Sequence, residues 1–378
     1  MEVQCKMKRF ISLLLVLVLL TSVVVGCTTN EDDTTEETPN VSEEDKTEDD
    51  DSEEDVSEGE VAEGEIVKLG LGQVISIGKS EDSEDDKPAT GQADVTMAAV
   101  GFDTDDKVAS VTIDTVQSKV DVDEEGKIES DINEEVDSKK VLKEDYNMKG
   151  ASEIDKEWYE QIEALEEWMI GKTVEEIAGM ESKEEGDEIV PDEEELTSSV
   201  TIAVNDYIEV VSKAWDNAIE IENGSTAGLG SKTILDGTKD GEDNKPAVVA
   251  ADTTMTATAF DSDGDVAGTI IDVVQIEIEV EDGKIITDKD EEILTKHELE
   301  DDYGMKKASD IDKEWYEQAE ALQEWMVGKS VSEIVEMDVT EKDESHVAVP
   351  DEEELTSSVT ITVEDYLEVV QRASDNAK

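Results

Sequence analysis

The chain contains very little cysteine and histidine. Cys5 and Cys27 are the only cysteines among its 378 residues, and His297 and His346 are the only histidines. Two cysteines are too few for a disulfide framework or a thiolate metal site, both of which need several cysteines at characteristic spacings. We therefore expect the folded part of the chain to depend on a packed core for its stability.

Basic residues are also scarce. The sequence has 31 Lys and Arg residues against 105 Asp and Glu residues, which gives a formal net charge of −74. Binding to nucleic acid depends on Lys and Arg contacts to phosphate, so this balance argues against a nucleic-acid partner. It also argues against docking on anionic lipid through a polybasic patch. Cations and cationic partners are compatible with the charge, whose simplest role is to keep an exported protein soluble.

The N-terminus has the pattern of an export signal. Lys8-Arg9 is followed by an apolar run over residues 10–20 and then by small and apolar residues. Val24-Val25-Gly26-Cys27 resembles the lipobox of bacterial lipoproteins. The resemblance implies that residues 1–26 are removed and that acylated Cys27 anchors the protein in the cell membrane, on its extracytoplasmic face. Met7 is an alternative translation start, because Met7-Lys8-Arg9 opens a more usual signal.

Residues 27–65 are predicted to form an acidic linker. From Thr28 to Glu60 the chain has many Asp and Glu residues, one Lys and no aromatic residue. Low hydrophobicity and like charges predict a disordered, extended segment. At about 3.3–3.6 Å per residue, it could reach on the order of 100 Å and hold the following residues away from the membrane.

The rest of the chain contains matching stretches. The segment from Asp155 to Gln161 returns unchanged from Asp312 to Gln318. A period of roughly 158 residues indicates a tandem duplication of a domain rather than a solenoid. We assign residues 66–222 to the first copy and 223–378 to the second. Further matching landmarks are Gly70-Leu71-Gly72 with Gly228-Leu229-Gly230, Lys87 with Lys245, Gln117 with Gln275, Tyr146 with Tyr303, and Pro191 to Ile202 with Pro350 to Ile361.

The duplication restricts the chemistry that both copies could share. Both histidines lie in the second copy, so a shared activity cannot rest on histidine. This argues against a Ser-His-Asp site and against most zinc sites. We assign no catalytic residue and no metal ligand from the sequence.

Each copy is predicted to begin with antiparallel strands. Asp94 to Phe102 and Val108 to Val122 are rich in Val, Thr and Ile, and residues 103–106 form a turn between them. A helix follows, with Ser152 as its expected cap and Gly171 as its end.

The last part of each copy is predicted to hold a short helix, a strand and a C-terminal helix. Thr173-x-x-Glu176 is a capping box that opens the short helix. The strand is expected over Ser198 to Ala203, and the final helix begins at Asn205 as its cap. A β-meander followed by these elements is an α+β fold.

Several side chains shared by the copies are candidates for ligand contact. Trp158 and Trp315 fall on the apolar stripe of their helices, so we expect them in the core. The polar residues of the repeated segment, such as Lys156 and Gln161, are expected on a solvated face. The candidate ligand contacts are Lys87, Lys245, Trp168, Trp325, Tyr146 and Tyr303.

The segment Asp261-Ser-Asp-Gly-Asp265 has alternating carboxylates that could hold Ca²⁺. An EF-hand loop needs glycine at its sixth position and glutamate at its twelfth, whereas Gly264 is fourth here and Asp272 is twelfth. The first copy has Lys107 in the last position of the corresponding segment. The segment is therefore better interpreted as a hairpin turn.

The Thr- and Ser-rich segment near the end of each copy resembles part of a flavoprotein family. Ser198-Ser-Val-Thr201 and Ser357-Ser-Val-Thr360 lie where the FMN-binding domains of bacterial lipoproteins and of sodium-pumping quinone reductases carry Ser/Thr-Gly-Ala-Thr. The resemblance implies FMN attached through a phosphoester to Thr201 and Thr360. Here Ser replaces Gly and Val replaces Ala, so the chain departs from the pattern at both small positions.

A broader resemblance is to tandem-domain, lipid-anchored clostridial surface proteins of unassigned function. It covers nearly all of residues 66–378 and is carried by Asp-Tyr-x-Met, Glu-Trp-Tyr-Glu-Gln and Gly-Lys in both copies. The sequence thus favours a lipid-anchored, extracytoplasmic protein with a non-enzymatic binding or envelope role. An FMN-carrying electron-transfer lipoprotein and a cation-dependent or solute-binding module are the alternatives.

Overall fold

A computed structural model describes residues 65–84, 87–185, 188–242, 245–343 and 346–378. All of them belong to one compact unit. The predicted signal, Cys27 and the linker up to residue 64 lie outside the described residues. We use "N-terminal half" for β1 to β6 and "C-terminal half" for β7 to α8.

The N-terminal half consists of three long strands, several helices, a small hairpin and a further strand. In chain order its elements are β1 (Ile66–Ser76), β2 (Ala89–Phe102), β3 (Val108–Val122), α1 (Lys139–Leu142), the 3-10 helix η1 (Lys143–Tyr146), α2 (Trp158–Met169), α3 (Val174–Ala178), β4 (Ser182–Glu185), β5 (Glu188–Pro191), α4 (Asn205–Asp216) and β6 (Ile219–Gly224).

The C-terminal half follows a closely similar order. Its elements are β7 (Thr226–Ile234), β8 (Ala247–Phe260), β9 (Val266–Glu281), β10 (Lys284–Ile285), α5 (Lys296–Leu299), η2 (Glu300–Tyr303), η3 (Met305–Lys307), α6 (Trp315–Met326), α7 (Val331–Val335), β11 (Val339–Thr340), β12 (Val349–Pro350) and α8 (Glu364–Asp375).

Each half contributes one main sheet of four antiparallel strands. The first sheet has the order β3-β2-β1-β6, and the second has the order β10-β9-β8-β7. The predicted boundary between the copies, after residue 222, falls within β6 of the first sheet, just before the chain passes into β7 of the second. Antiparallel sheets together with helices make this a mixed fold compatible with the predicted α+β class.

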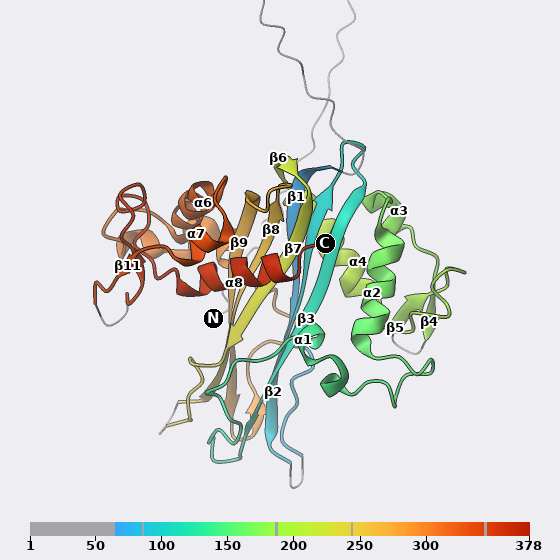
Figure 1. Ribbon diagram of the computed structural model, residues 1–378. Helices are drawn as coiled ribbons and strands as arrows, with labels where there is room; N and C mark the ends of the chain where they lie inside the picture. Colours follow the sequence, from blue (N-terminus) through green and yellow to red (C-terminus); the bar gives the residue numbers. More distant parts are fainter. Residues whose placement is uncertain (1–64, 85–86, 186–187, 243–244, 344–345) are drawn as a thin grey trace, which may run out of the picture. The chain divides into compact units, whose positions relative to one another are not determined.

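The two sheets share a core between them. One apolar cluster combines inward-facing side chains of β2, such as Val95 and Met97, with those of β8, such as Met255 and Ala257. The opposite face of each sheet is covered by helices of its own half, and Figure 1 shows α2 to α4 on one side and α6 to α8 on the other. β2 is therefore buried on both faces along almost its whole length.

The C-terminal helix of each half lies directly on a strand backbone at the repeated Gly-Leu-Gly. A Cβ atom on Gly70 would lie 1.9 Å from the carbonyl oxygen of Ala214 in α4. On Gly228 it would lie equally close to the carbonyl oxygen of Ala373 in α8. Glycine is needed here because any side chain would force helix and strand apart. The sequence marked these positions as landmarks without indicating this contact.

Several sequence predictions match the described elements. β3 covers Val108–Val122 as expected, and β2 contains the predicted strand with five further residues at its start. The capping box of Thr173 and Glu176 opens α3. The helix expected from Ser152 begins only at Trp158, because Glu157 and Glu160 form the capping box instead.

The predicted strand over Ser198–Ala203 is wrong. These residues form turns and irregular chain, and the strands of this region are β4 and β5, which pair as a small hairpin. The hydroxyl groups of Thr197 and Ser199 donate to the carbonyl oxygens of Glu194 and Leu196. Such bonds from a side chain back to the preceding backbone stabilise turns in competition with a strand.

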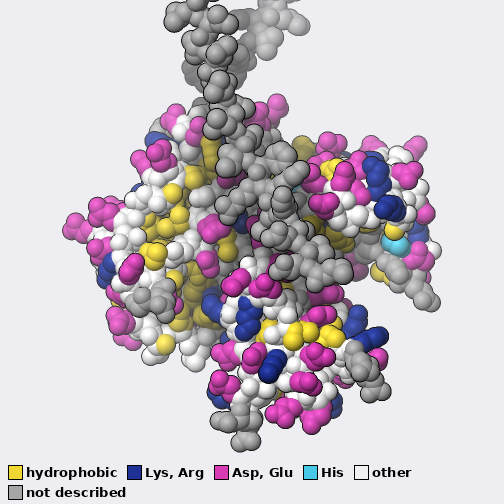
Figure 2. Space-filling view, turned by 180° about the vertical axis from the view of Figure 1, so that it is seen from behind, with side chains coloured by type: hydrophobic (Ala, Val, Ile, Leu, Met, Phe, Trp, Pro, Cys, Tyr) yellow, Lys and Arg dark blue, Asp and Glu magenta, His cyan; other side chains and the backbone are white. Residues whose placement is uncertain are grey.

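The surface is acidic over both halves. In Figure 2, Asp and Glu side chains are spread over most of the visible face, and Lys and Arg side chains form only small groups. None of the helices in the described part of the chain has the length and apolar character needed to cross a membrane.

The close contact at the Gly-Leu-Gly segment gives a stability prediction. We expect Gly70→Ala to lower the free energy of unfolding by about 3 kcal/mol, as overpacking of a core does. Urea unfolding followed by circular dichroism measures this change. Gly150→Ala is the matched control, because a Cβ there has no neighbour within 4 Å. Equal effects of the two substitutions would contradict the described packing.

Candidate functional site

The candidate site is built around the lysine that begins the short helix after the meander. Lys139 is the first residue of α1, and Ser138 caps that helix by accepting from the backbone N–H of Val141. The Ser138 hydroxyl donates to Asp114 Oδ2 at 2.5 Å, which ties the start of α1 to β3. Because Asp114 is buried, desolvation raises the pKa of its carboxyl group.

The ammonium group of Lys139 lies between two aromatic rings. Its Nζ is 4.9 Å from the ring centroid of Tyr146 and 5.2 Å from that of Trp158. These distances allow cation–π attraction. Burial nevertheless lowers the pKa of Lys139 to about 8, and the nearby Asp94 carboxylate opposes this shift only in part.

Trp158 joins the site to the C-terminal helix of its half. Its Nε1–H donates to the hydroxyl oxygen of Tyr207 at 2.8 Å, and the two rings meet edge to face. Trp158 is in the core, as predicted from its place on the apolar stripe. The bond connects α2 to α4 and fixes one wall of the site.

A chain of hydrogen bonds forms the side of the site that faces the sheet. The Tyr146 hydroxyl donates to Gln117 Oε1 at 3.0 Å, and Gln117 Nε2 donates to Asp94 Oδ1 at 3.2 Å. Lys79 lies 3.0 Å from the other oxygen of Asp94. The phenol, amide and carboxylate are thereby held in one orientation by the adjacent strands β2 and β3.

The C-terminal half repeats this arrangement. Lys296 Nζ lies 5.1 Å from the ring centroid of Tyr303 and 5.6 Å from that of Trp315, whose Nε1–H donates to Tyr366 at 2.9 Å. Burial lowers the pKa of Lys296 as well. Tyr303 donates to Gln275, and Gln275 donates to Asp252, which lies in β8.

The site of the N-terminal half opens into a pocket of about 600 Å³. Carboxylates from several elements line it, including Glu153, Glu188 and Asp206, together with Lys79 and Lys139. In the C-terminal half, a smaller pocket of about 150 Å³ adjoins Met305 and Thr360. The groups present can bind and orient a polar ligand through hydrogen bonds and aromatic contacts.

Thr201 and Thr360, the candidate FMN acceptors, line these two pockets. The hydroxyl group of Thr201 donates to Gln161 Oε1 at 3.2 Å, and its backbone N–H donates to the same oxygen at 2.8 Å. Thr360 makes the same pair of bonds to Gln318.

The solvated position expected for Gln161 is therefore wrong. Gln161 and Gln318 are completely buried, because each amide ties its helix to the turn that contains the threonine. A signal was available in the spacing, because Gln161 lies three residues after Trp158 and four before Leu165 and so falls on the apolar face of the helix.

The other candidate ligand contacts lie elsewhere. Lys87 and Lys245 are exposed at loops before β2 and β8, and neither lines the pockets described above. Trp168 is buried, with the ammonium group of Lys172 4.5 Å from its ring centroid, and Trp325 is half-buried beneath Lys329 at the same distance. Only Tyr146 and Tyr303 among these candidates belong to the repeated site.

Four residues of the site are not among the candidates expected from the sequence, namely Lys139, Lys296, Tyr207 and Tyr366. A signal was available, since Lys139 precedes Tyr146 by the same seven residues that separate Lys296 from Tyr303. What spacing could not show is that the tyrosines of α4 and α8 meet the tryptophans of α2 and α6.

No group of three or more His, Cys, Asp or Glu side chains within the described ranges is arranged to hold a metal ion. The carboxylate of Asp261 instead accepts from the backbone N–H groups of Asp263 and Asp265. This segment lies between β8 and β9 as a turn, which confirms the hairpin interpretation.

No protein-family model matches this chain. Comparison with curated proteins and with solved structures yields no significant match either.

The lowered pKa of Lys139 predicts a pH-dependent stability. Between about pH 8 and 10.5 the folded protein has released this proton while the unfolded chain still binds it, so the free energy of unfolding rises with pH. Lys139→Met lacks this contribution. We expect wild-type stability to rise relative to the variant by about 3 kcal/mol over this range.

Urea unfolding of both proteins at several pH values measures the difference. Lys149→Met, at an exposed lysine, is the control. A difference between wild type and Lys139→Met that stays constant with pH would show that the Lys139 ammonium group is not desolvated.

Proposed function

We propose that this protein is a lipid-anchored, extracytoplasmic binding protein with no catalytic role. The lipobox-like sequence ending at Cys27 supports the anchor, and the acidic linker supports a position away from the membrane surface. The observation that carries the binding role is the same lysine–aromatic site in both halves, at Lys139 and at Lys296. A binding module that is present twice gains effective affinity for a ligand with repeated units.

We also propose that the two halves are copies of one domain. Strands β3-β2-β1 and β9-β8-β7 follow the same order, and α4 and α8 lie on the first strand of their sheets at Gly-Leu-Gly. The hydrogen bond between Trp158 and Tyr207 has its counterpart between Trp315 and Tyr366. These correspondences extend the sequence match to contacts between distant residues.

The site suits a neutral polyhydroxylated ligand. The pocket of the N-terminal half carries aligned amide, phenol and carboxylate groups at Gln117, Tyr146 and Asp94. Planar polar groups of the protein can hydrogen-bond the hydroxyl groups of such a ligand, while an apolar face of the ligand's ring packs on an aromatic side chain. Its carboxylates outnumber its lysines, so an anionic ligand is disfavoured.

The lipid anchor is tested by Cys27→Ser. We expect the wild-type protein in the membrane fraction, with the mass of its N-terminal peptide increased by fatty acyl groups. The variant should lose this modification and appear in the soluble or secreted fraction, because it has no site for the acyl chains. Unmodified wild-type protein in the cytosol would refute the proposal.

The ligand class is tested with fragments of the producing cell's own wall glycan. Tyr146→Ala combined with Tyr303→Ala removes one aromatic wall of both sites. We expect at least a tenfold loss of affinity in calorimetry, since the ring contacts contribute about 1.4 kcal/mol or more. Trp168→Phe, outside the pocket, is the control. Equal binding of the glycan fragments by the wild type, the double tyrosine variant and Trp168→Phe would show that they do not bind at this site.

A covalent flavoprotein is the second candidate function. It is favoured by one observation, namely that Thr201 lines the pocket beside Tyr146 and Trp158. If FMN is attached, protein purified from its own membrane is yellow, and peptides containing Thr201 or Thr360 carry the added mass. We expect colourless protein with unmodified peptides, because the hydroxyl groups of both threonines already bond to buried glutamine side chains.

A further inference from the structure

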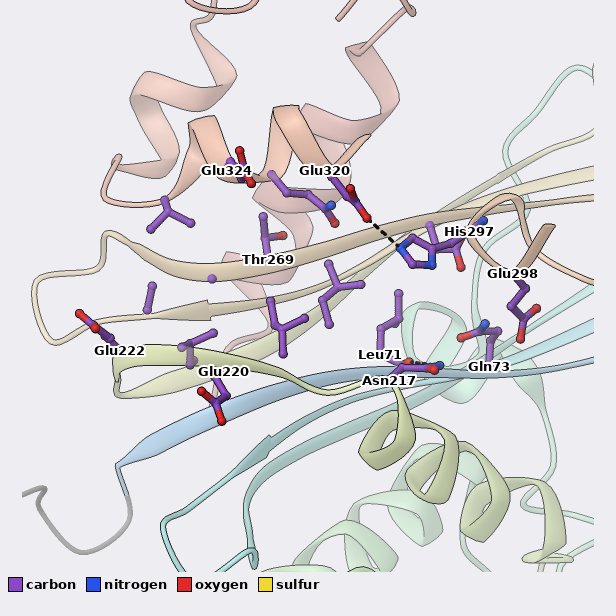
Figure 3. Close-up of a pocket in the computed structure, with 18 residues that line it drawn as sticks. Leu71, Gln73, Asn217, Glu220, Glu222, Thr269, His297, Glu298, Glu320 and Glu324 are labelled. Carbon is purple, nitrogen blue, oxygen red and sulfur yellow. Dashed lines mark hydrogen bonds and ion pairs between the residues drawn. The ribbon is translucent and has the colours of Figure 1, made fainter. Parts of the chain in front are cut away.

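A further pocket lies apart from the two lysine sites, between the halves. It has a volume of about 810 Å³ and is bounded by β6 of the first sheet, β9 of the second sheet, and helices α5 and α6. Figure 3 shows residues from all these elements around one cavity. We call it the acidic groove. Its floor is apolar and includes Leu71, Ile221 and Ile270, and the partly exposed Ile219 and Val327 lie at its margin.

The rim of the groove carries negative charge that no lining lysine or arginine balances. Six of the residues that line it are acidic, and none of the described residues that line it is Lys or Arg. His297 also lines the groove, and its Nε2 lies 3.9 Å from Glu320. The exposed carboxylates of the rim belong to Glu220, Glu222, Glu298, Glu320 and Glu324, whereas the sixth acidic residue, Asp272, is buried.

A buried hydrogen-bond acceptor also lines the groove. Gln73 is 2% exposed, and its side-chain oxygen has no hydrogen-bond partner among the described residues. Figure 3 shows this amide at the end of the cavity near His297. A buried acceptor without a donor is unfavourable by about 1–3 kcal/mol, so a ligand that brings an N–H group there is stabilised.

The molecule contains a second pocket at the corresponding place beside β3 and β7. That pocket, of about 500 Å³, is lined by four basic residues, which are Lys140, Lys143, Arg372 and Lys378. Three of the basic side chains, those of Lys140, Arg372 and Lys378, are paired with carboxylates. Lys378 Nζ lies 2.9 Å from Glu166, and Arg372 binds Glu135.

Part of the difference between the two pockets follows from one position on the helix beside each. Glu166 in α2 accepts from the backbone N–H of Ile113, and Gln323 in α6 accepts from that of Ile271. The buried charge of Glu166 is balanced by Lys140 and Lys378. Gln323 is neutral and needs no such partner, and His297 stands where the other half has Lys140.

The pocket beside β3 and β7, which is lined by Lys378, also shows what kind of group such a pocket accommodates. Besides its ion pair, Lys378 exchanges two backbone hydrogen bonds with Ala227 at the start of β7, of 3.1 and 3.2 Å. A polypeptide segment with a basic side chain thus lies against the strand and the helix carboxylate. In the acidic groove Ile219 pairs with Leu69 at the equivalent position, so the backbone there is already covered but the side chain is apolar and the cation is missing.

From these observations we propose that the acidic groove binds a basic peptide segment of a partner protein. Ammonium or guanidinium groups of that segment pair with the rim carboxylates, and one N–H group reaches Gln73. Apolar side chains between the basic ones cover Ile219, Ile221 and Val327. Charge complementarity of this kind sets specificity and association rate, and the apolar floor adds affinity.

The test uses the intact protein and a short synthetic peptide of alternating lysine and leucine, with calorimetry at physiological ionic strength. In one variant Glu222, Glu320 and Glu324 are all changed to Gln. In the matched control Glu277, Glu279 and Glu281, exposed at the far end of β9, are changed to Gln. We expect the groove variant to weaken binding at least tenfold and the control to change it by about twofold or less.

Gln73→Leu gives an independent readout. Removing an unpartnered buried acceptor is expected to keep or raise the melting temperature of the free protein while weakening peptide binding by about threefold or more. A role for Gln73 in folding alone would lower the melting temperature and leave binding unchanged. Equal weakening by the groove and control variants, or equally tight binding of a lysine–glycine peptide, would show non-specific attraction and overturn the proposal.

Discussion

The packing of the two main sheets against each other is the constraint on which the rest of the structure depends. A sheet with apolar residues on both faces must be covered twice, and each half has helices for only one face. The second face is covered by the sheet of the other half. Face-to-face packing of this kind forms a continuous core in which neither sheet is independent of the other.

This arrangement explains where the sites lie. The face of each sheet that meets helices can hold a pocket at the end of the helix layer, and the lysine sites are found there, once in each half. The edges where the sheets meet leave two further pockets, beside β6 and β9 and beside β3 and β7. The sites within the halves are therefore repeated, whereas the pockets between the halves differ in charge.

The long strands could be predicted from the sequence because their Val-, Thr- and Ile-rich runs are bounded by clear turns. Helix α3 could be predicted from its capping box. The face-to-face packing of the two sheets could not be predicted. A strand with apolar residues on both faces does not show what covers its second face. The strand expected at Ser198–Ala203 failed because hydroxyl groups that favour strands by composition here bond back to the preceding backbone.

For the candidate site, the sequence indicated Tyr146 and Tyr303 but not the lysines between the rings. A lysine is usually a surface residue, and only the fold shows that Lys139 and Lys296 are enclosed by aromatic side chains. Gln161 was misplaced for the same reason, because a polar residue on a charged segment can still be fully buried when its amide is fully bonded.

The most direct test of the shared core is native-state hydrogen exchange at increasing urea concentration, read separately from β2 and β8. If the sheets depend on each other, amides of both strands exchange through one common unfolding step with the same free energy and the same urea dependence. If β8 exchanges through an opening that leaves β2 protected, or the reverse, the two sheets are independent and this account of the structure is wrong.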